Sequence, residues 1–490
     1  MRHLSPFRVG LAALLAAACA ACSSSPSAAS ASSDAKAKDA ASGGFAVLNL
    51  EYSKPAAVST AVRATLAGLT PRTSVELSWG TVTGGWVIED YYHFRGKKYS
   101  EATTSLGRFT TDDHGQLDAS FAVPEDFGGV HEVTVLVDGK PVAQNGIEVT
   151  QTFVMNPASG PVGTPIELTA KGLGWRTMES TWVVNWDNQE LGFVSAASTR
   201  GSAVARFRAA GPAGDHVVKL YTGWQGQAYL NYEQSPIAEL PRPQFTFRTT
   251  PGGDATVFAE PYAPQPAPKD ETIPAGAALT LEPRQGPVGT RAVLKGAGFG
   301  AGTQLKVAWG TAAGSRVSGN GFAMEDRPLG EITVGPNGRI EWPVTIPDDL
   351  GGLHAVSLSS GTKAIAQTHF VIETSIVSMT PRSGPAGTPV SIHLKGVGWT
   401  EYDNVYIATY DNAYMGYACG FNSQGDVVIN FTAAGEPGLH IVDLYPGIYQ
   451  GPPTEAQQLY RLPQLTYADD HPGNRIPALR FAFEVTAQRR

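Results

Sequence analysis

Apolar and polar residues alternate along most of the chain with a period of two. Clear examples are residues 75–79 (Val-Glu-Leu-Ser-Trp) and 133–137 (Val-Thr-Val-Leu-Val), and each is bounded by Gly, Pro or Asp. Such alternation over short runs between turn residues is typical of half-buried β-strands. Because residues 45–152 contain no sustained helical period, the pattern predicts an all-β fold.

A short phrase recurs along the chain and divides it into modules. It consists of Gly, any residue, His, any residue and an apolar residue, and its copies lie at 129–133, 214–218, 352–356 and 438–442. Other matches pair the first module with the third (Trp-Gly-Thr at 79–81 and 309–311) and the second with the fourth (Asp-Asn at 187–188 and 411–412). Internal repeats of this kind mark repeated structural units. We therefore predict four modules arranged as a duplicated two-module unit.

The last three modules share an opening motif. It reads Pro-x-x-Gly-Pro, then Val or Ala, then Gly-Thr, at residues 157–164, 283–290 and 381–388. A strand pattern and Gly-x-Gly with Trp or Phe follow each copy, and this order resembles the IPT/TIG group of immunoglobulin-like domains. The resemblance implies tandem immunoglobulin-like β-sandwiches with binding, spacing or accessory roles and no catalytic residues. In the first module, residues 52–55 (Tyr-Ser-Lys-Pro) replace the opener.

The N-terminus has the pattern of an export signal. A positive start precedes a short apolar run from Val9 to Ala21, which is too short to cross a bilayer comfortably as a helix. Small residues then lead to Cys22 and a Ser-rich tail, which resembles the lipobox of bacterial lipoproteins, with Cys19 as the alternative. That resemblance implies a lipid on the cysteine and, because Ser23 rather than Asp follows Cys22, an address at the outer membrane or cell surface, facing outward or the periplasm. An ordinary signal peptide cleaved nearby is the other interpretation.

These patterns together give the expected organisation of the chain. In order, we expect a lipoprotein signal peptide (1–22), a disordered tether (23–44), a first immunoglobulin-like module (45–152), a second (153–250), a Pro/Ala-rich linker (251–277), a third (278–376) and a fourth (377–490).

Composition and charge narrow the classes of function. A chain of 490 residues is too long for one core, and its 55 Gly and 35 Pro fit many turns. The net charge is -8, and no stripe of clustered Lys and Arg is visible. This argues against nucleic-acid binding, which depends on basic patches.

The four histidines of the repeated phrase raise the question of a metal site. They lie one per module and tens of residues apart, and no His-x-His pair accompanies them. We favour a half-buried strand histidine whose ring donates to a loop carbonyl. The Asp-Asn pairs fit hairpin turns better than calcium ligands, because Asx residues bond to nearby backbone. With no Gly-x-Ser-x-Gly and no His-Glu-x-x-His motif, we predict no catalytic residues, no metal and no cofactor.

Aromatic residues in loops form the candidate binding surface. They are Trp86, Tyr91, Tyr92, Tyr221, Trp224, Tyr229, Tyr232, Tyr445 and Tyr449. Flat rings in such places stack on sugar faces or anchor a protein partner. The alternative is that they cap the sandwich ends or pack module against module.

The sequence thus predicts a non-catalytic cell-surface lipoprotein whose modules serve in binding, adhesion or envelope structure. Its expected partners are the membrane, through the lipid anchor, and a protein or glycan ligand. One alternative is a carbohydrate-binding lipoprotein that uses its loop aromatics, and a further alternative is an enzyme with an unrecognised site.

Overall fold

A computed structural model describes most of the chain from residue 46 onward. The described residues are 46–89, 93–224, 227–231, 234, 240–263, 269–272, 276–315, 321–420, 424–448, 462–473 and 476–488. The signal peptide, the tether, Cys19 and Cys22 lie outside them. Within these residues every regular element is a β-strand except one short helix, α1 (Tyr467–Asp470). No helix of the described residues is long and apolar enough to cross a membrane.

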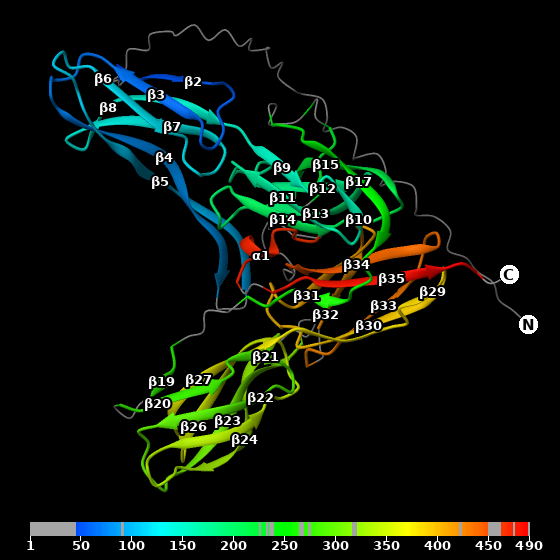
Figure 1. The fold of residues 1–490 in the computed structure, drawn as a ribbon. Helices are drawn as coiled ribbons and strands as arrows, with labels where there is room; N and C mark the ends of the chain where they lie inside the picture. The colour runs from blue at the N-terminus through cyan, green and yellow to red at the C-terminus, as the bar shows by residue number, and fades with distance from the viewer. Residues whose placement is uncertain are drawn as a thin grey trace, which may run out of the picture. The chain divides into compact units, whose positions relative to one another are not determined.

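The first module is a sandwich of two sheets, which Figure 1 shows as facing layers. The larger sheet contains, in spatial order, β1 (Ala46–Val47), β8 (Lys140–Val149), β7 (Gly129–Val137), β4 (Ser74–Glu89) and β5 (His93–Thr110). The smaller sheet contains β2 (Asn49–Tyr52), β3 (Ala61–Leu66) and β6 (Leu117–Ala122).

The second module repeats this topology. Its larger sheet contains β10 (Ser159–Val162), β17 (Gln244–Gly253), β15 (Gly214–Trp224), β12 (Thr181–Trp186) and β13 (Gln189–Ser195), with β16 (Gln227–Ala228) beside β15. Its smaller sheet contains β14 (Ala203–Arg208), β11 (Pro165–Lys171) and β9 (Thr152–Asn156).

The third and fourth modules follow the same plan. The larger sheet of the third contains β19 (Glu271–Thr272), β27 (Lys363–Glu373), β26 (Gly352–Ser360), β23 (Gln304–Gly314) and β24 (Phe322–Thr333), with β21 (Gln285–Pro287) on β27. Its smaller sheet contains β20 (Ala278–Glu282), β22 (Arg291–Ala297) and β25 (Ile340–Thr345).

The larger sheet of the fourth contains β18 (Phe258–Ala259), β35 (Leu479–Thr486), β34 (Gly438–Gly447), β31 (Val405–Tyr410) and β32 (Ala413–Cys419), with β29 (Ser383–Pro385) on β35. Its smaller sheet contains β28 (Ser375–Thr380), β30 (Pro389–Lys395) and β33 (Val427–Thr432). The predicted fold class, four immunoglobulin-like sandwiches in a duplicated two-module unit, is confirmed.

Part of the expected linker between the second and third modules forms strands that pair with the fourth and third modules. Strand β18 pairs with β35 of the fourth module, and β19 pairs with β27 of the third. The fourth module therefore receives a strand from a segment that precedes the whole third module in the sequence. Two-residue strands give too little alternation to be distinguished from a Pro/Ala-rich linker by pattern.

The alternation of side chains places the core. On β7, for example, His131, Val133 and Val135 are buried, whereas Val130 and Glu132 are exposed. A buried Trp lies in the core of each of the first three modules (Trp79, Trp182 and Trp309), and Tyr406 is buried in the fourth.

The second and fourth modules share a buried ionic network. Arg208 of β14 donates to Asp443 of β34 at 2.5 Å, and Arg480 of β35 donates to the same carboxylate at 3.0 Å. The side chains of Arg208, Asp443 and Arg480 are only 4%, 0% and 3% exposed. Glu260 bonds to the other side of the Arg480 guanidinium at 2.7 Å. The two modules are therefore joined through charges that are satisfied only when both are in place.

The β4–β5 hairpin continues far beyond the first sandwich and reaches both of these modules. We call residues 80–89 and 93–103 the hairpin arm. Along it, Trp86 Nε1 donates to the backbone oxygen of Asp470 at 2.7 Å, and Lys97 Nζ donates to Ser180 Oγ at 2.7 Å. Phe94 is fully buried in a cluster with residues of the second and fourth modules. The arm thus ties the first module to residues almost 400 positions away, and Figure 1 shows it ending beside α1.

Removal of the Asp443 carboxylate should destabilise the protein much more than removal of an exposed carboxylate. We expect Asp443→Ala to lower the free energy of unfolding by about 3–5 kcal/mol, because two buried guanidinium groups lose the carboxylate that they share. Denaturant unfolding monitored by fluorescence measures the change. The matched control is Asp118→Ala, whose carboxylate pairs with Arg63 at 2.7 Å but is exposed, and it should have little effect. Equal losses in the two variants would contradict this role of Asp443.

Candidate functional site

The histidines of the first and third modules hold a loop to the neighbouring strand. His131 Nδ1 lies 2.8 Å from the carbonyl oxygen of Gly80, and its Nε2 lies 2.7 Å from that of Phe127. His354 makes the equivalent two contacts in the third module, at 2.9 and 2.8 Å. Each ring also stacks on the buried Trp of its module, with centroids 4.4 and 4.5 Å apart. Each is therefore a strand histidine bonded to a loop carbonyl, as predicted, but its ring is buried and not half-buried.

In the second and fourth modules a carboxylate replaces one of the two carbonyls. The Nδ1 atoms of His216 and His440 each lie 2.5 Å from an oxygen of Asp187 and Asp411, respectively. Both Asp residues begin a two-residue turn with positive φ, so each Asp-Asn pair forms the hairpin turn that the sequence predicts. The hydrogen bond that His440 donates to the Asp411 carboxylate raises the pKa of His440 above its ordinary value.

These side chains do not converge on an ion. Each histidine is bonded within its own module, and the described part of the chain holds no group of three or more His, Cys, Asp or Glu that could bind a metal. Their role in the structure is to fix the loop that precedes each late strand.

The aromatic residues predicted as a binding surface lie in several different environments. Tyr445 is completely buried, and its ring packs against Tyr467 of α1 at a centroid distance of 6.0 Å. Trp86 bonds to Asp470 at the other end of the same helix. Trp86 of the first module thus packs against the fourth, and Tyr445 of the fourth lies in one hydrophobic cluster with core residues of the second. Both therefore pack module against module, which was the alternative interpretation of the aromatic segments.

The remaining aromatic residues of that prediction belong to the second module or lie outside the described residues. Tyr221 is 8% exposed, with Lys219 Nζ 4.9 Å from its ring centroid. Tyr229 is half-buried, and its hydroxyl donates to the backbone oxygen of Gln234 at 3.3 Å. Trp224 is the last residue of β15. Tyr91, Tyr92, Tyr232 and Tyr449 lie outside the described residues.

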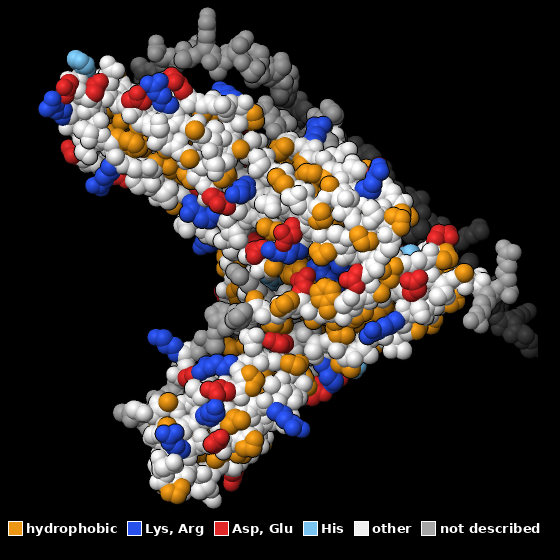
Figure 2. Space-filling view, in the orientation of Figure 1, with side chains coloured by type: hydrophobic (Ala, Val, Ile, Leu, Met, Phe, Trp, Pro, Cys, Tyr) orange, Lys and Arg blue, Asp and Glu red, His pale blue; other side chains and the backbone are white. Residues whose placement is uncertain are grey.

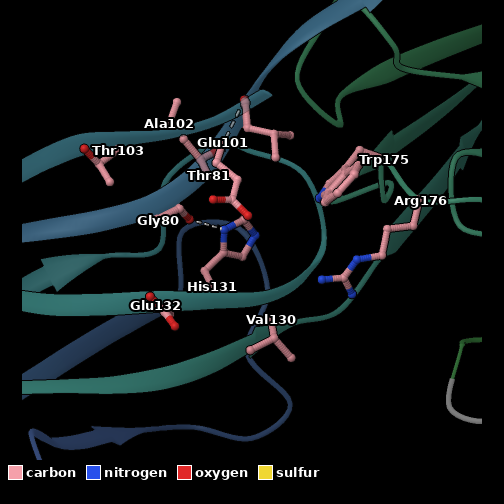
Figure 3. Close-up of a pocket in the computed structure, with 11 residues that line it drawn as sticks. Gly80, Thr81, Glu101, Ala102, Thr103, Val130, His131, Glu132, Trp175 and Arg176 are labelled. Carbon is pink, nitrogen blue, oxygen red and sulfur yellow. Dashed lines mark hydrogen bonds between the residues drawn. The ribbon is translucent and has the colours of Figure 1, made fainter. Parts of the chain in front are cut away.

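A groove opens where β4 leaves the sheet of the first module. Strand β4 pairs with β7 only from Glu76 to Trp79. Beyond Trp79, β4 continues with β5 into the hairpin arm, whereas β7 stays beside β8. The contact between His131 and Gly80 joins the two strands at the point of separation. We call this hollow the split-strand groove, and Figure 3 shows it in close-up.

The walls of the split-strand groove come from both the first and the second module. They are formed by Gly80, Thr81, Val82, Glu101, Ala102, Thr103, Val130, His131, Glu132, Trp175 and Arg176. Its volume is about 670 Å³, within the range of roughly 300–1,000 Å³ typical of small-molecule sites. In Figure 3, Trp175 and the guanidinium of Arg176 face Glu101 and His131 across the hollow.

The second-module wall is a Trp held from two sides. The Trp175 ring lies 5.7 Å from that of Tyr99 on the hairpin arm, and the Arg176 guanidinium lies 5.4 Å from its centroid. Trp175 is half-buried and Arg176 is exposed. Trp175 belongs to the Gly-x-Gly-aromatic turn, which the sequence marks as a signature of fold. The four polar or aromatic side chains that define the groove, Glu101, Glu132, Trp175 and Arg176, are absent from the sequence-based prediction.

Comparison with known proteins adds little to this description. No family model matches the chain, and neither does any curated protein. Among solved structures, Salmonella alpha-2-macroglobulin reacted with methylamine is 10% identical over 90% of this chain, with a TM-score of 0.17, and this chain spans 31% of that one. Invasin, a bacterial integrin-binding protein, is 10% identical over 90% of this chain and 79% of its own, with a TM-score of 0.17.

The D1–D4 ectodomain fragment of ICAM-5 is 12% identical over 85% of this chain and 99% of its own, with a TM-score of 0.16. These scores are far below those of proteins that share an overall structure. The immunoglobulin-like architecture described above rests on the strand pairing of this chain.

Raising the pH should weaken the fourth module through His440. Because its folded-state pKa is raised above the ordinary value of 6.5, protonation of His440 stabilises the fold fully below pH 6.5. This contribution is lost as the pH rises through the folded-state pKa. We expect His440→Gln to flatten the decline in unfolding free energy above pH 6.5, as measured by denaturant unfolding across the pH range. An unchanged pH dependence in this variant would show that the decline comes from other groups.

Proposed function

We propose that this chain is a non-catalytic binding protein of the cell envelope, held at the membrane by a lipid on Cys22 and facing outward or the periplasm. The observation that carries the binding role is the split-strand groove, a polar hollow whose first-module wall consists of paired strands. A site built on strands and fixed by neighbouring contacts presents its side chains in a constant geometry. Adhesion and envelope structure are the broader roles that fit this arrangement.

The packing around the groove supports the proposal. The hairpin arm that forms one wall is anchored at its far end by Trp86 and Phe94, and the opposite wall belongs to the module that the arm contacts through Lys97. Burial lowers the pKa of Lys97 to about 8, as expected for an ammonium group that is removed from water by this contact. Both walls therefore depend on the same interface, which limits how far they move apart.

The surface charge fits a ligand other than nucleic acid. On the face shown in Figure 2, Lys and Arg side chains alternate with Asp and Glu side chains and form no extended basic field. The chain carries a net charge of -8. Nucleic-acid binding would require the opposite balance.

The anchor can be tested at the two candidate cysteines. In cells that produce the full-length chain, we expect Cys22→Ala to abolish incorporation of labelled palmitate and to move the protein out of the membrane fraction, because a thioether-linked lipid requires the cysteine. Cys19→Ala is the matched control and should leave both readouts unchanged. Labelling that persists in Cys22→Ala and disappears in Cys19→Ala would assign the anchor to Cys19, and no labelling of the wild type would contradict a lipid anchor.

The binding role can be tested with the full-length chain in detergent and envelope fractions of the producing cells. We expect saturable retention, reduced at least about tenfold by the triple change Glu101→Met, Glu132→Ala and Arg176→Thr, since a few central residues carry most of the binding energy. The control is Met324→Ala. Met324 is an exposed residue of the second unit at the position that corresponds to Glu101, and this variant should bind as the wild type does. Absence of saturable retention would contradict the proposed function.

A further inference from the structure

We propose that the split-strand groove binds a neutral or amine-bearing oligosaccharide. This inference rests on the proposed binding function. The groove combines one indole with a ring of hydrogen-bonding side chains, whereas sites for apolar molecules are lined mainly by hydrophobic residues. A sugar ring presents both matching features. It has a weakly polar face that packs on an aromatic ring, and it has hydroxyl groups around its edge.

The polar side chains are of the types that bind hydroxyl groups in pairs. The Glu101 and Glu132 carboxylates each offer two acceptor oxygens, and the Arg176 guanidinium offers a planar set of donors. Hydroxyls of Thr81 and Thr103 donate or accept as required. Neighbouring sugar hydroxyls, which act as both donor and acceptor, can therefore be satisfied from either module.

The net charge of the groove lining favours the binding of some classes of sugar over others. Its two carboxylates against one guanidinium give an excess of one negative charge. An acidic saccharide would add like charge beside Glu101 and Glu132, whereas a neutral one adds none and an amine gains an ion pair. The structure therefore favours neutral hexoses, N-acetylhexosamines and hexosamines over uronic acids.

An added peptide strand does not fit the same gap. The backbone nitrogen and oxygen of Glu132 lie only 3.5 Å from the point where a Cβ on Gly80 would stand. Paired strands are about 4.8 Å apart, so a strand between β4 and β7 would need roughly twice that separation. The bond from His131 to Gly80 also closes this path.

The second unit provides an internal comparison. Strand pairing places Met324 at the position of Glu101, and the repeated phrases place Ala355 at that of Glu132. There the equivalent Trp399 is only 9% exposed, in an apolar cluster with Ala312 and Leu350. Phe322 lies 5.6 Å from its ring, much as Tyr99 lies 5.7 Å from that of Trp175. Glu325 and Asp326 take the places of Ala102 and Thr103, and Thr400 replaces Arg176, so both units carry carboxylates there, whereas a guanidinium at the position of Arg176 is specific to the first unit.

The proposal can be tested by calorimetry on the full-length chain in detergent. The probes are tetrasaccharides of glucose, N-acetylglucosamine and glucosamine, with tetragalacturonate as the acidic comparison. We expect saturable binding of at least one of the first three and none of tetragalacturonate. Trp175→Ala and Glu101→Met should each weaken binding at least about tenfold, as for central contact residues. Met324→Ala is the control and should have no effect.

Each outcome bears on the groove and not only on the fold. Because Trp175 contributes to packing, the exposed Glu101→Met variant tests the site without removing that ring. No binding of any neutral or amine-bearing probe, or binding that both variants leave intact, would overturn the oligosaccharide proposal. If envelope retention still depends on the groove in that case, the proposed binding function stands with a protein ligand. If retention is absent as well, both fail.

Discussion

The carboxylate of Asp443 is the group on which the arrangement of the second and fourth modules depends. A buried charge without a partner costs several kcal/mol, and Asp443 is satisfied by Arg480 of its own module and Arg208 of another. Separating the modules would leave Arg208 or Asp443 without part of its partner set. Residues of the second and fourth modules that are 235 positions apart in sequence therefore belong to one cooperative structure. The bond from Asn412 to the backbone oxygen of Arg208, 204 positions away, also indicates this. The fixed walls of the groove follow from this constraint, because the hairpin arm docks on both modules.

Duplication explains why the chain contains both a groove and its counterpart. The two first-type modules share the Trp, the His and the separation of two strands beside them, so the backbone of the hollow is inherited. What differs is the lining. Trp399 is buried among apolar side chains at one junction, whereas Trp175 is half-buried and lines the groove at the other. A single scaffold thus serves packing in one copy and offers a ligand site in the other.

The sequence predicts the local features of this fold well and the contacts between modules poorly. Alternation and the repeated phrase determine strand faces, the number of modules and the role of His131, because each depends on neighbours within one sandwich. The burial of Tyr445 depends on Tyr467 and on another module, so pattern alone does not distinguish it from an exposed loop ring. Glu101 and Glu132 carry only the signal of polar residues on exposed strand faces. They become a site because β4 and β7 separate, which the sequence does not indicate.

The length of the hairpin arm has a consequence for the order in which the protein can be completed. A chain is made from its N-terminus, and the partner of Trp86 lies 384 residues later, in α1. The first sandwich can close early, since its own strands suffice, but Trp86 and Phe94 gain all their contacts only after the chain has emerged as far as Asp470. During that interval Phe94 and Trp86 lack the contacts that they make in the complete fold. The last module to emerge is therefore the one that completes the first.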